Sequence, residues 1–127
     1  MWKDFTSYII NQCQPNDKVV EVGVGKFHEV ACNLQRHSKM NIVITDIKPC
    51  HEGVIQDDIN HPKLSIYYGA SIIYSIRPPM ELHQSLINLA ESVGATLIIK
   101  TLTGDDINTK KKMRLVNYKK SVFYVYP

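Results

Sequence analysis

The stretch that decides the fold is Lys18–Phe27, which reads KVVEVGVGKF. Its run of β-branched residues predicts a buried strand, and the two glycines that follow predict a sharp turn before the chain becomes helical. Only glycine lets the backbone turn tightly there and come close to a bound molecule. A strand, a glycine turn and a helix in this order form the arrangement with which many α/β proteins hold nucleotide-type ligands.

Outward from this turn, strand patterns alternate with helical patterns. We expect helices over 2–12 and 26–37 and after Pro78-Pro79, and strands over 18–22, 41–46, 53–56, 71–75, 95–100, 113–117 and 121–126. Residues 59–70 fit neither pattern. The alternation predicts one three-layer α/β domain over residues 1–127, with a mostly parallel sheet and a C-terminal antiparallel hairpin.

Two links of this predicted sheet are short. A parallel crossover with its helix needs about 10–12 residues, and neither Asp46 to Val54 nor 102–112 offers a convincing helix. The sheet is therefore expected to have abbreviated helices and an exposed apolar face. Because a bare apolar face is costly in water, we expect a homodimer or a partner chain to cover it.

The composition describes an ordinary globular chain of 127 residues, 44% hydrophobic and 21% charged. No apolar run reaches the roughly 20 residues that cross a bilayer, and the first residues lack the layout of a signal peptide, so we expect a cytoplasmic protein without membrane contact. Cys13, Cys32 and Cys50 form no CxxC pair and are expected to be free thiols. The polar residues of 50–61 match no zinc spacing, so no metal is expected.

The basic residues are unevenly placed. Six of the 15 lie after the last acid, Asp106, which leaves nine against 12 acidic residues in the rest of the chain; the six are Lys110, Lys111, Lys112, Arg114, Lys119 and Lys120. Lysines on an edge hairpin discourage edge-to-edge pairing with another sheet. The alternative is a non-catalytic module that binds RNA or protein through this hairpin, although no stacking aromatics are clearly interleaved with the basic run.

The residues around the glycine turn discriminate between two ligand classes. Dinucleotides call for G-x-G-x-x-G, with the pyrophosphate at the helix N-terminus. Here His28 occupies the third glycine position, and Glu21 would repel a pyrophosphate. S-adenosylmethionine carries cationic sulfonium and ammonium groups, which an acid at the strand end attracts. An NAD-type dinucleotide remains the alternative.

The pattern Glu21-x-Gly23-x-Gly25 resembles the first motif of class I S-adenosylmethionine-dependent methyltransferases. The resemblance implies that this turn binds the cofactor and that an acid at the end of the second strand accepts hydrogen bonds from the ribose hydroxyls. Asp46 stands there. A polar residue after the third strand would meet the adenine edge, a role for Asp57 or Asp58, of which we choose Asp58.

The stretch Ser75-Ile76-Arg77-Pro78-Pro79-Met80 follows the fourth strand. Methyltransferases that act on amino groups often carry Asn or Asp there, followed by Pro-Pro and an aromatic residue. The two prolines match, whereas Ser75 or Arg77 replaces the acid or amide. Both are substrate-side candidates, and Arg77 could bind an anionic substrate or close on the ligand. Neither a catalytic residue nor a methyl acceptor is assigned.

Nearly the whole chain resembles a small uncharacterised family of short archaeal proteins with a Rossmann-like, methyltransferase-type fold. The stretches that carry this resemblance are VVEVGVGKFHEVA (19–31), TDIKP (45–49) and SIRPP (75–79). The resemblance implies an α/β Rossmann-like domain that binds S-adenosylmethionine or a related adenosyl ligand, as a methyltransferase or a degenerate relative of one.

Overall fold

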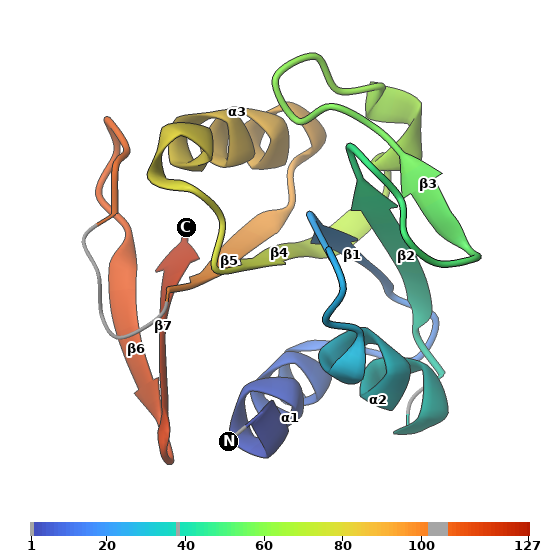
Figure 1. The fold of residues 1–127 in the computed structure, drawn as a ribbon. Coiled ribbons are helices and arrows are strands. Elements are labelled where there is room, and N and C mark those ends of the chain that lie inside the picture. Colours follow the sequence, from blue (N-terminus) through green and yellow to red (C-terminus); the bar gives the residue numbers. More distant parts are fainter. Residues whose placement is uncertain (1, 38, 102–106) are drawn as a thin grey trace.

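A computed structural model describes residues 2–37, 39–101 and 107–127. These residues form one α/β domain around a seven-stranded sheet, with helices on both faces (Figure 1). The predicted fold class is confirmed. Among the described residues, no helix is long and apolar enough to cross a membrane.

The sheet has the strand order β3-β2-β1-β4-β5-β7-β6. Strands β1 to β5 run parallel, and β7 is antiparallel to both of its neighbours. The strands are β1 Lys18–Val22, β2 Asn41–Asp46, β3 Val54–Gln56, β4 Ala70–Ile76, β5 Thr96–Lys100, β6 Arg114–Tyr118 and β7 Ser121–Tyr126. Each strand expected from the sequence is present, with its ends shifted by no more than a residue or so.

Two helices cover one face of the sheet and a third covers the other (Figure 1). They are α1 Trp2–Gln12 and α2 Glu29–His37 on one side and α3 His83–Val93 on the opposite side. Short 3₁₀ turns, η1 Leu64–Ile66 and η2 Met80–Leu82, precede β4 and α3. The helix expected to begin at residue 26 begins at Glu29, because residues 23–28 are used by the turn itself.

Two apolar clusters fill the space between these layers. Phe5, Val30 and Leu34 pack with alternate residues of β1, β4 and β7 on the α1/α2 face. On the other face, Leu86 and Ile87 of α3 pack with Val20 and Val22 of β1. Alternation along β1 therefore assigns Val20 and Val22 to one face and Val19 and Glu21 to the other.

No helix connects β2 to β3, as expected from the short link. Residues 57–69 compensate, because Ile59 and Tyr67 are buried in the cluster beneath α3. The expectation of a bare sheet face is therefore wrong for the central strands, whose described neighbours cover both faces. The homodimer or partner chain was inferred from that bare face. It stays a prediction, and the sheet faces no longer support it. The first part of the 102–112 link, residues 102–106, lies outside the described residues.

Candidate functional site

A cavity opens at the carboxyl edge of the sheet, between the ends of β1, β2 and β4, residues 57–60 and α3. It encloses about 170 Å³, less than the roughly 300–1,000 Å³ of typical ligand pockets, so a ligand of ordinary size would extend out of it. Five predicted site residues line the cavity, namely Gly23, Asp46, Asp58, Ser75 and Arg77. Glu21 and Gly25 are not part of its wall.

The glycine turn is held by the end of β2. The backbone N–H groups of Gly23 and Val24 both donate to the carbonyl oxygen of Thr45, at 2.9 and 3.2 Å. Gly23 and Gly25 have φ angles of +72° and +58°, which side chains with a Cβ rarely adopt. A Cβ at Gly23 would lie 3.9 Å from the Ser75 hydroxyl. The glycines are needed for this conformation, and Gly23 opens its bare backbone to the cavity.

Asp46 connects the turn to its own loop. Its Oδ2 accepts the backbone N–H of Gly25 at 2.7 Å and its Oδ1 accepts that of Lys48 at 2.8 Å. Since a carboxylate oxygen has two lone-pair sites, each oxygen keeps capacity for a second donor. Asp46 can therefore hold the turn in place and still accept hydrogen bonds from a ligand's hydroxyl groups.

The sequence offered both Asp57 and Asp58 as the residue that meets the adenine edge, and their hydrogen bonds in the structure differ. Asp57 is engaged through both oxygens, with the Lys63 N–H on Oδ1 and the Tyr67 hydroxyl on Oδ2, at 3.1 and 2.5 Å. Asp58 accepts only the Asn60 N–H, at 2.9 Å on Oδ1. Both line the cavity, but Asp58 has one oxygen without a described partner. Asp57 thus has mainly a structural role.

Glu21 lies beneath the turn on the α1/α2 face, and only 1% of its surface is exposed. The Tyr74 hydroxyl donates to its Oε1 at 2.7 Å. Burial raises the pKa of Glu21 to about 7, while the Tyr74 hydrogen bond partly opposes the rise. The charge that we expected to select a cationic ligand is therefore buried, outside the cavity wall, and dependent on pH near neutrality.

The two substrate-side candidates have different surroundings. Ser75 is buried, and its hydroxyl donates to the Val22 carbonyl at 2.8 Å, which ties β4 to the end of β1. Arg77 is exposed and has a φ of +52°. Its backbone N–H donates to the Lys100 carbonyl at 2.7 Å, and its guanidinium lies over the Trp2 ring, 5.4 Å from the centroid.

Several residues at or near the cavity were not predicted from the sequence. Trp2 and Phe27 bring their rings to 4.7 Å, and Lys100 lies close enough to Arg77 for the two charges to interact. Ile47 lines the cavity although 55% of its surface is exposed. Of these residues, Ile47 alone could have been predicted, because it directly follows Asp46. The other contacts join segments far apart in the chain.

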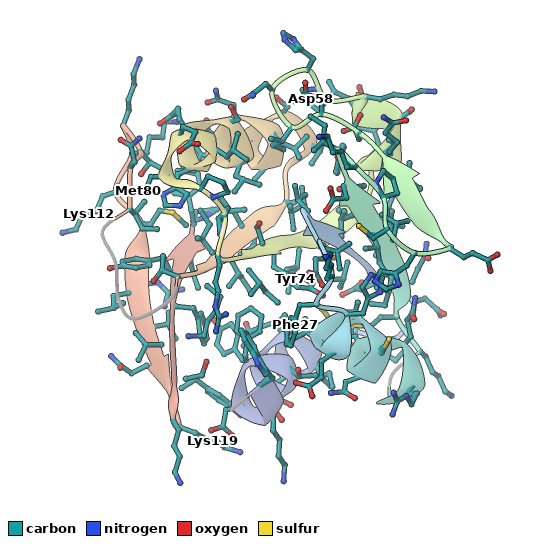
Figure 2. All side chains as sticks on the ribbon, in the orientation of Figure 1. Phe27, Asp58, Tyr74, Met80, Lys112 and Lys119 are labelled. Atoms are coloured by element: carbon teal, nitrogen blue, oxygen red, sulfur yellow. The ribbon has the colours of Figure 1, made fainter. Side chains whose placement is uncertain are left out.

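The basic C-terminal residues form two groups rather than one patch. Lys112 and Lys119 lie at opposite ends of the β6–β7 hairpin (Figure 2). Lys111 pairs with Glu91, and the Lys119 ammonium lies over the Tyr118 ring. The backbone N–H of Lys120 donates to Asp4 of α1. The Lys119–Lys120 turn is thus attached to the N-terminal turn of α1.

Solved structures with a similar fold cover almost all of this chain. An S-adenosyl-L-methionine methyl transferase from Silicibacter pomeroyi is 14% identical, with a TM-score of 0.63 over 95% of this chain and 88% of its own. A mutant of MtNAS in complex with S-adenosylmethionine is 10% identical, with a TM-score of 0.65 over 98% and 61% of the two chains. At these identities the likeness establishes a methyltransferase-type fold.

Relatives in sequence are archaeal. A protein from Methanothermobacter thermautotrophicus is 54% identical over 99% of this chain and 95% of its own, and one from Archaeoglobus fulgidus is 43% identical over 85% and 82% of the two chains. Both have the name UPF0146 protein. The model of that family matches residues 2–127. The chain therefore belongs to the uncharacterised protein family UPF0146.

Proposed function

We propose that this protein binds S-adenosylmethionine, or its demethylated product S-adenosylhomocysteine, in the cavity at the ends of β1, β2 and β4, and that it transfers the methyl group to an acceptor. The observation that carries the proposal is the charge of the cavity wall. Its ionisable residues are Asp46, Asp57, Asp58 and Arg77. With three carboxylates and one guanidinium, the wall is negative overall. It therefore repels phosphate groups and favours a ligand without them.

The wall has groups suited to each part of an adenosyl ligand. Asp46 retains lone pairs for two ribose hydroxyls, and the unbonded Oδ2 of Asp58 can accept from the adenine amino group. Ile47, Ile59 and Leu86 offer apolar surface to the ring. The bare backbone of Gly23 leaves room for the sulfur-bearing chain, and Glu21 beneath it contributes negative potential when ionised.

Several of these features disfavour the alternative NAD-type ligand. A pyrophosphate normally lies on the N-terminus of the helix after the turn. Here no residue of α2 lines the cavity, and the first turn of that helix contains Glu29. Similar folds in S-adenosylmethionine proteins agree with the preferred ligand.

When bound, S-adenosylmethionine supplies an electrophilic methyl group on a sulfonium. The chain's own part would be to fix the ribose through Asp46, to hold the turn open through Gly23 and Gly25, and to place Arg77 where an acceptor would approach. Ser75 would keep the ends of β1 and β4 in register through its bond to Val22.

Calorimetric titration with S-adenosylmethionine, S-adenosylhomocysteine and NAD tests the ligand. We expect saturable binding of the first two and none of NAD. Asp46→Asn should weaken binding by more than tenfold, because it removes acceptors for the ribose and disturbs the Gly25 bond, and Asp58→Asn by about tenfold. Binding of NAD alone would reverse the order of the two hypotheses.

A matched control keeps this comparison specific. Glu52→Gln removes one carboxylate charge from an exposed residue that does not line the cavity, and it should leave the affinity unchanged. Equal losses in Glu52→Gln and Asp58→Asn would mean that only the net charge matters, and the adenine contact would then be rejected.

A further inference from the structure

Next to Arg77, which forms part of the cavity wall, two aromatic rings and two cations come together from four separate segments. Trp2 belongs to α1, Phe27 to the loop before α2, Arg77 follows β4, and Lys100 ends β5. The Trp2 and Phe27 rings are 4.7 Å apart at an interplanar angle of 47°. Figure 2 shows Phe27 at the start of α2, on the opposite side of the sheet from Asp58.

We infer that this Trp2–Phe27–Arg77–Lys100 cluster is the acceptor subsite and that it binds a nucleobase whose nucleotide carries a phosphate. The inference deepens the proposed function and rests on it, since it names the class of acceptor that would meet the methyl donor. Arg77 connects the two regions, because it lines the cavity while its guanidinium covers the Trp2 ring.

The two cations argue for an anionic ligand. Burial is the main cause that lowers the pKa of Lys100, and the Arg77 charge lowers it further. Among the described residues, no carboxylate pairs with either cation, and the sole ion pair joins Lys111 to Glu91. Two adjacent positive charges repel each other until an anion joins them, and a phosphate monoester with a charge of about −2 matches both.

The backbone of Arg77 has an unusual conformation. A φ of +52° is unfavourable for a residue with a long side chain, and such backbone conformations gather at functional sites. The hydrogen bond from its N–H to the Lys100 carbonyl, at 2.7 Å, fixes this conformation. The same bond brings the two cationic residues together at the carboxyl ends of β4 and β5.

The aromatic pair argues for a planar group. Phe27 is a large apolar residue with 37% of its surface exposed. A planar base can stack on the exposed Phe27 ring, which Trp2 supports from behind while Arg77 makes a cation–π contact with Trp2. Base stacking tolerates all four nucleobases, so the cluster defines a chemical class rather than one nucleotide.

Trp2 is the only tryptophan of the chain, so its fluorescence reports directly on this cluster. The experiment titrates the full-length protein, saturated with S-adenosylhomocysteine, with each of the four nucleoside 5′-monophosphates, the matching nucleosides and inorganic phosphate. We expect the monophosphates to change the fluorescence saturably and the nucleosides and phosphate to bind at least about tenfold more weakly. Equal binding of nucleosides and monophosphates, or no response to any of them, overturns the inference.

Variants separate the cluster from general charge effects. Arg77→Gln and Lys100→Gln should each weaken monophosphate binding by about tenfold, whereas Lys112→Gln, an equal charge change at the far end of the hairpin (Figure 2), should change it less than about twofold. If either of these two variants fails to fold, the other still tests whether the cluster binds the phosphate. Unchanged affinity in a folded cluster variant rejects the role of that cation.

A single-stranded RNA hexanucleotide distinguishes the two sources of such a group. Tighter binding of the strand than of the monophosphates assigns the subsite to RNA, and equal affinity assigns it to free nucleotides; either result supports the shared chemistry. Failure of the proposed function is read separately. If calorimetry detects no adenosyl ligand, the same titration without S-adenosylhomocysteine still decides whether the cluster binds a phosphate-bearing base.

Discussion

At the scale of single residues, Glu21 is the most unusual group in the domain. It is a carboxyl on a central strand, with 1% of its surface exposed and one hydrogen bond from Tyr74. Burial raises its folded-state pKa from 4.5 to about 7. The folded protein therefore keeps a proton that the unfolded chain releases above about pH 4.5. The stability associated with the neutral carboxyl is complete below that pH and is lost as pH rises through 7.

Glu21→Gln should remove this pH dependence. A shift of this size corresponds to about 3 kcal/mol, so the variant should be more stable than the wild type by up to that amount at pH 8 and about equal to it at pH 4.5. Urea unfolding at both pH values measures the difference. Glu52→Gln, on the surface, is the matched control and should give the same stability difference at either pH. If Glu21→Gln were more stable than the wild type by the same amount at both pH values, the raised pKa of Glu21 would be contradicted.

The turn glycines allow a similar separation of stability from binding. Gly23→Ala should cost about 1–2 kcal/mol, because its φ of +72° is unfavourable for alanine. Gly53→Ala has a comparable φ of +82° and open space for its Cβ, so the loss of stability should be similar. Only Gly23→Ala adds a methyl group to the cavity wall. Thermal unfolding and calorimetry with S-adenosylhomocysteine should show two similar destabilisations but one loss of affinity.

At the scale of elements, the central strands β1, β4 and β5 could be predicted from the sequence because each is a short apolar run, rich in β-branched residues, that is largely buried. The second helix shows where local patterns end. Phe27, Val30, Ala31 and Leu34 have helical spacing, and the last three are indeed fully buried. Phe27 instead packs on Trp2 in the preceding loop. That contact depends on the position of α1, which spacing within residues 26–37 does not encode.

The candidate site was predictable to a similar extent. Residues that follow strands, such as Asp46 and Arg77, reach the cavity because parallel strands end at one edge of the sheet. Glu21 was expected there too, but it lies within β1, where alternation places it opposite Val22. Because Val22 lines the cavity, Glu21 cannot share its face. The division of roles between Asp57 and Asp58 depends on Tyr67, whose hydroxyl reaches Asp57 from the other end of a loop.

The start of α3 holds the segment that leads into β6. The Asn108 N–H donates to Nδ1 of buried His83 at 3.1 Å, and the Lys110 N–H donates to the Gln84 side chain at 2.7 Å. Burial is the main cause that lowers the pKa of His83 below 6.5. The neutral imidazole that accepts this bond therefore adds stability above pH 6.5, and that stability is lost as pH falls toward the folded-state pKa.

Amide hydrogen exchange can isolate this link. Protection of the Asn108 amide, corrected for intrinsic exchange, should decrease as pH falls from 6.5 toward the lower folded-state pKa of His83, because imidazolium cannot accept its hydrogen bond. Lys110 is the internal reference, since Gln84 does not titrate. Gln84→Ala should reverse the pattern by exposing Lys110 while Asn108 remains protected. Parallel loss of protection at both amides would mean that the whole segment detaches for another reason.

At the scale of the whole molecule, α1 packs against β6 and β7, so the first helix contacts the last two strands. Phe5 of α1 is fully buried and contacts the rings of Tyr74 and Phe123, with centroids 5.9 and 5.3 Å away. The α1 helix is also attached to the hairpin through Asn11, whose side-chain amide donates to the Tyr118 hydroxyl at 3.0 Å. The first element and the last two strands should therefore unfold in one transition.

Phe5→Ala tests this cooperativity. Deleting a fully buried ring costs about 3–5 kcal/mol, and the loss should appear in the domain as a whole, because Phe123 in β7 loses its cover. Tyr68→Ala, at a residue with 57% of its surface exposed, should change stability by no more than about 0.5 kcal/mol. Trp2 fluorescence reports on α1 and far-ultraviolet circular dichroism on the whole domain. Coincident denaturant transitions in Phe5→Ala are expected; an earlier fluorescence transition would show that α1 detaches alone and that the remaining sheet is stable without it.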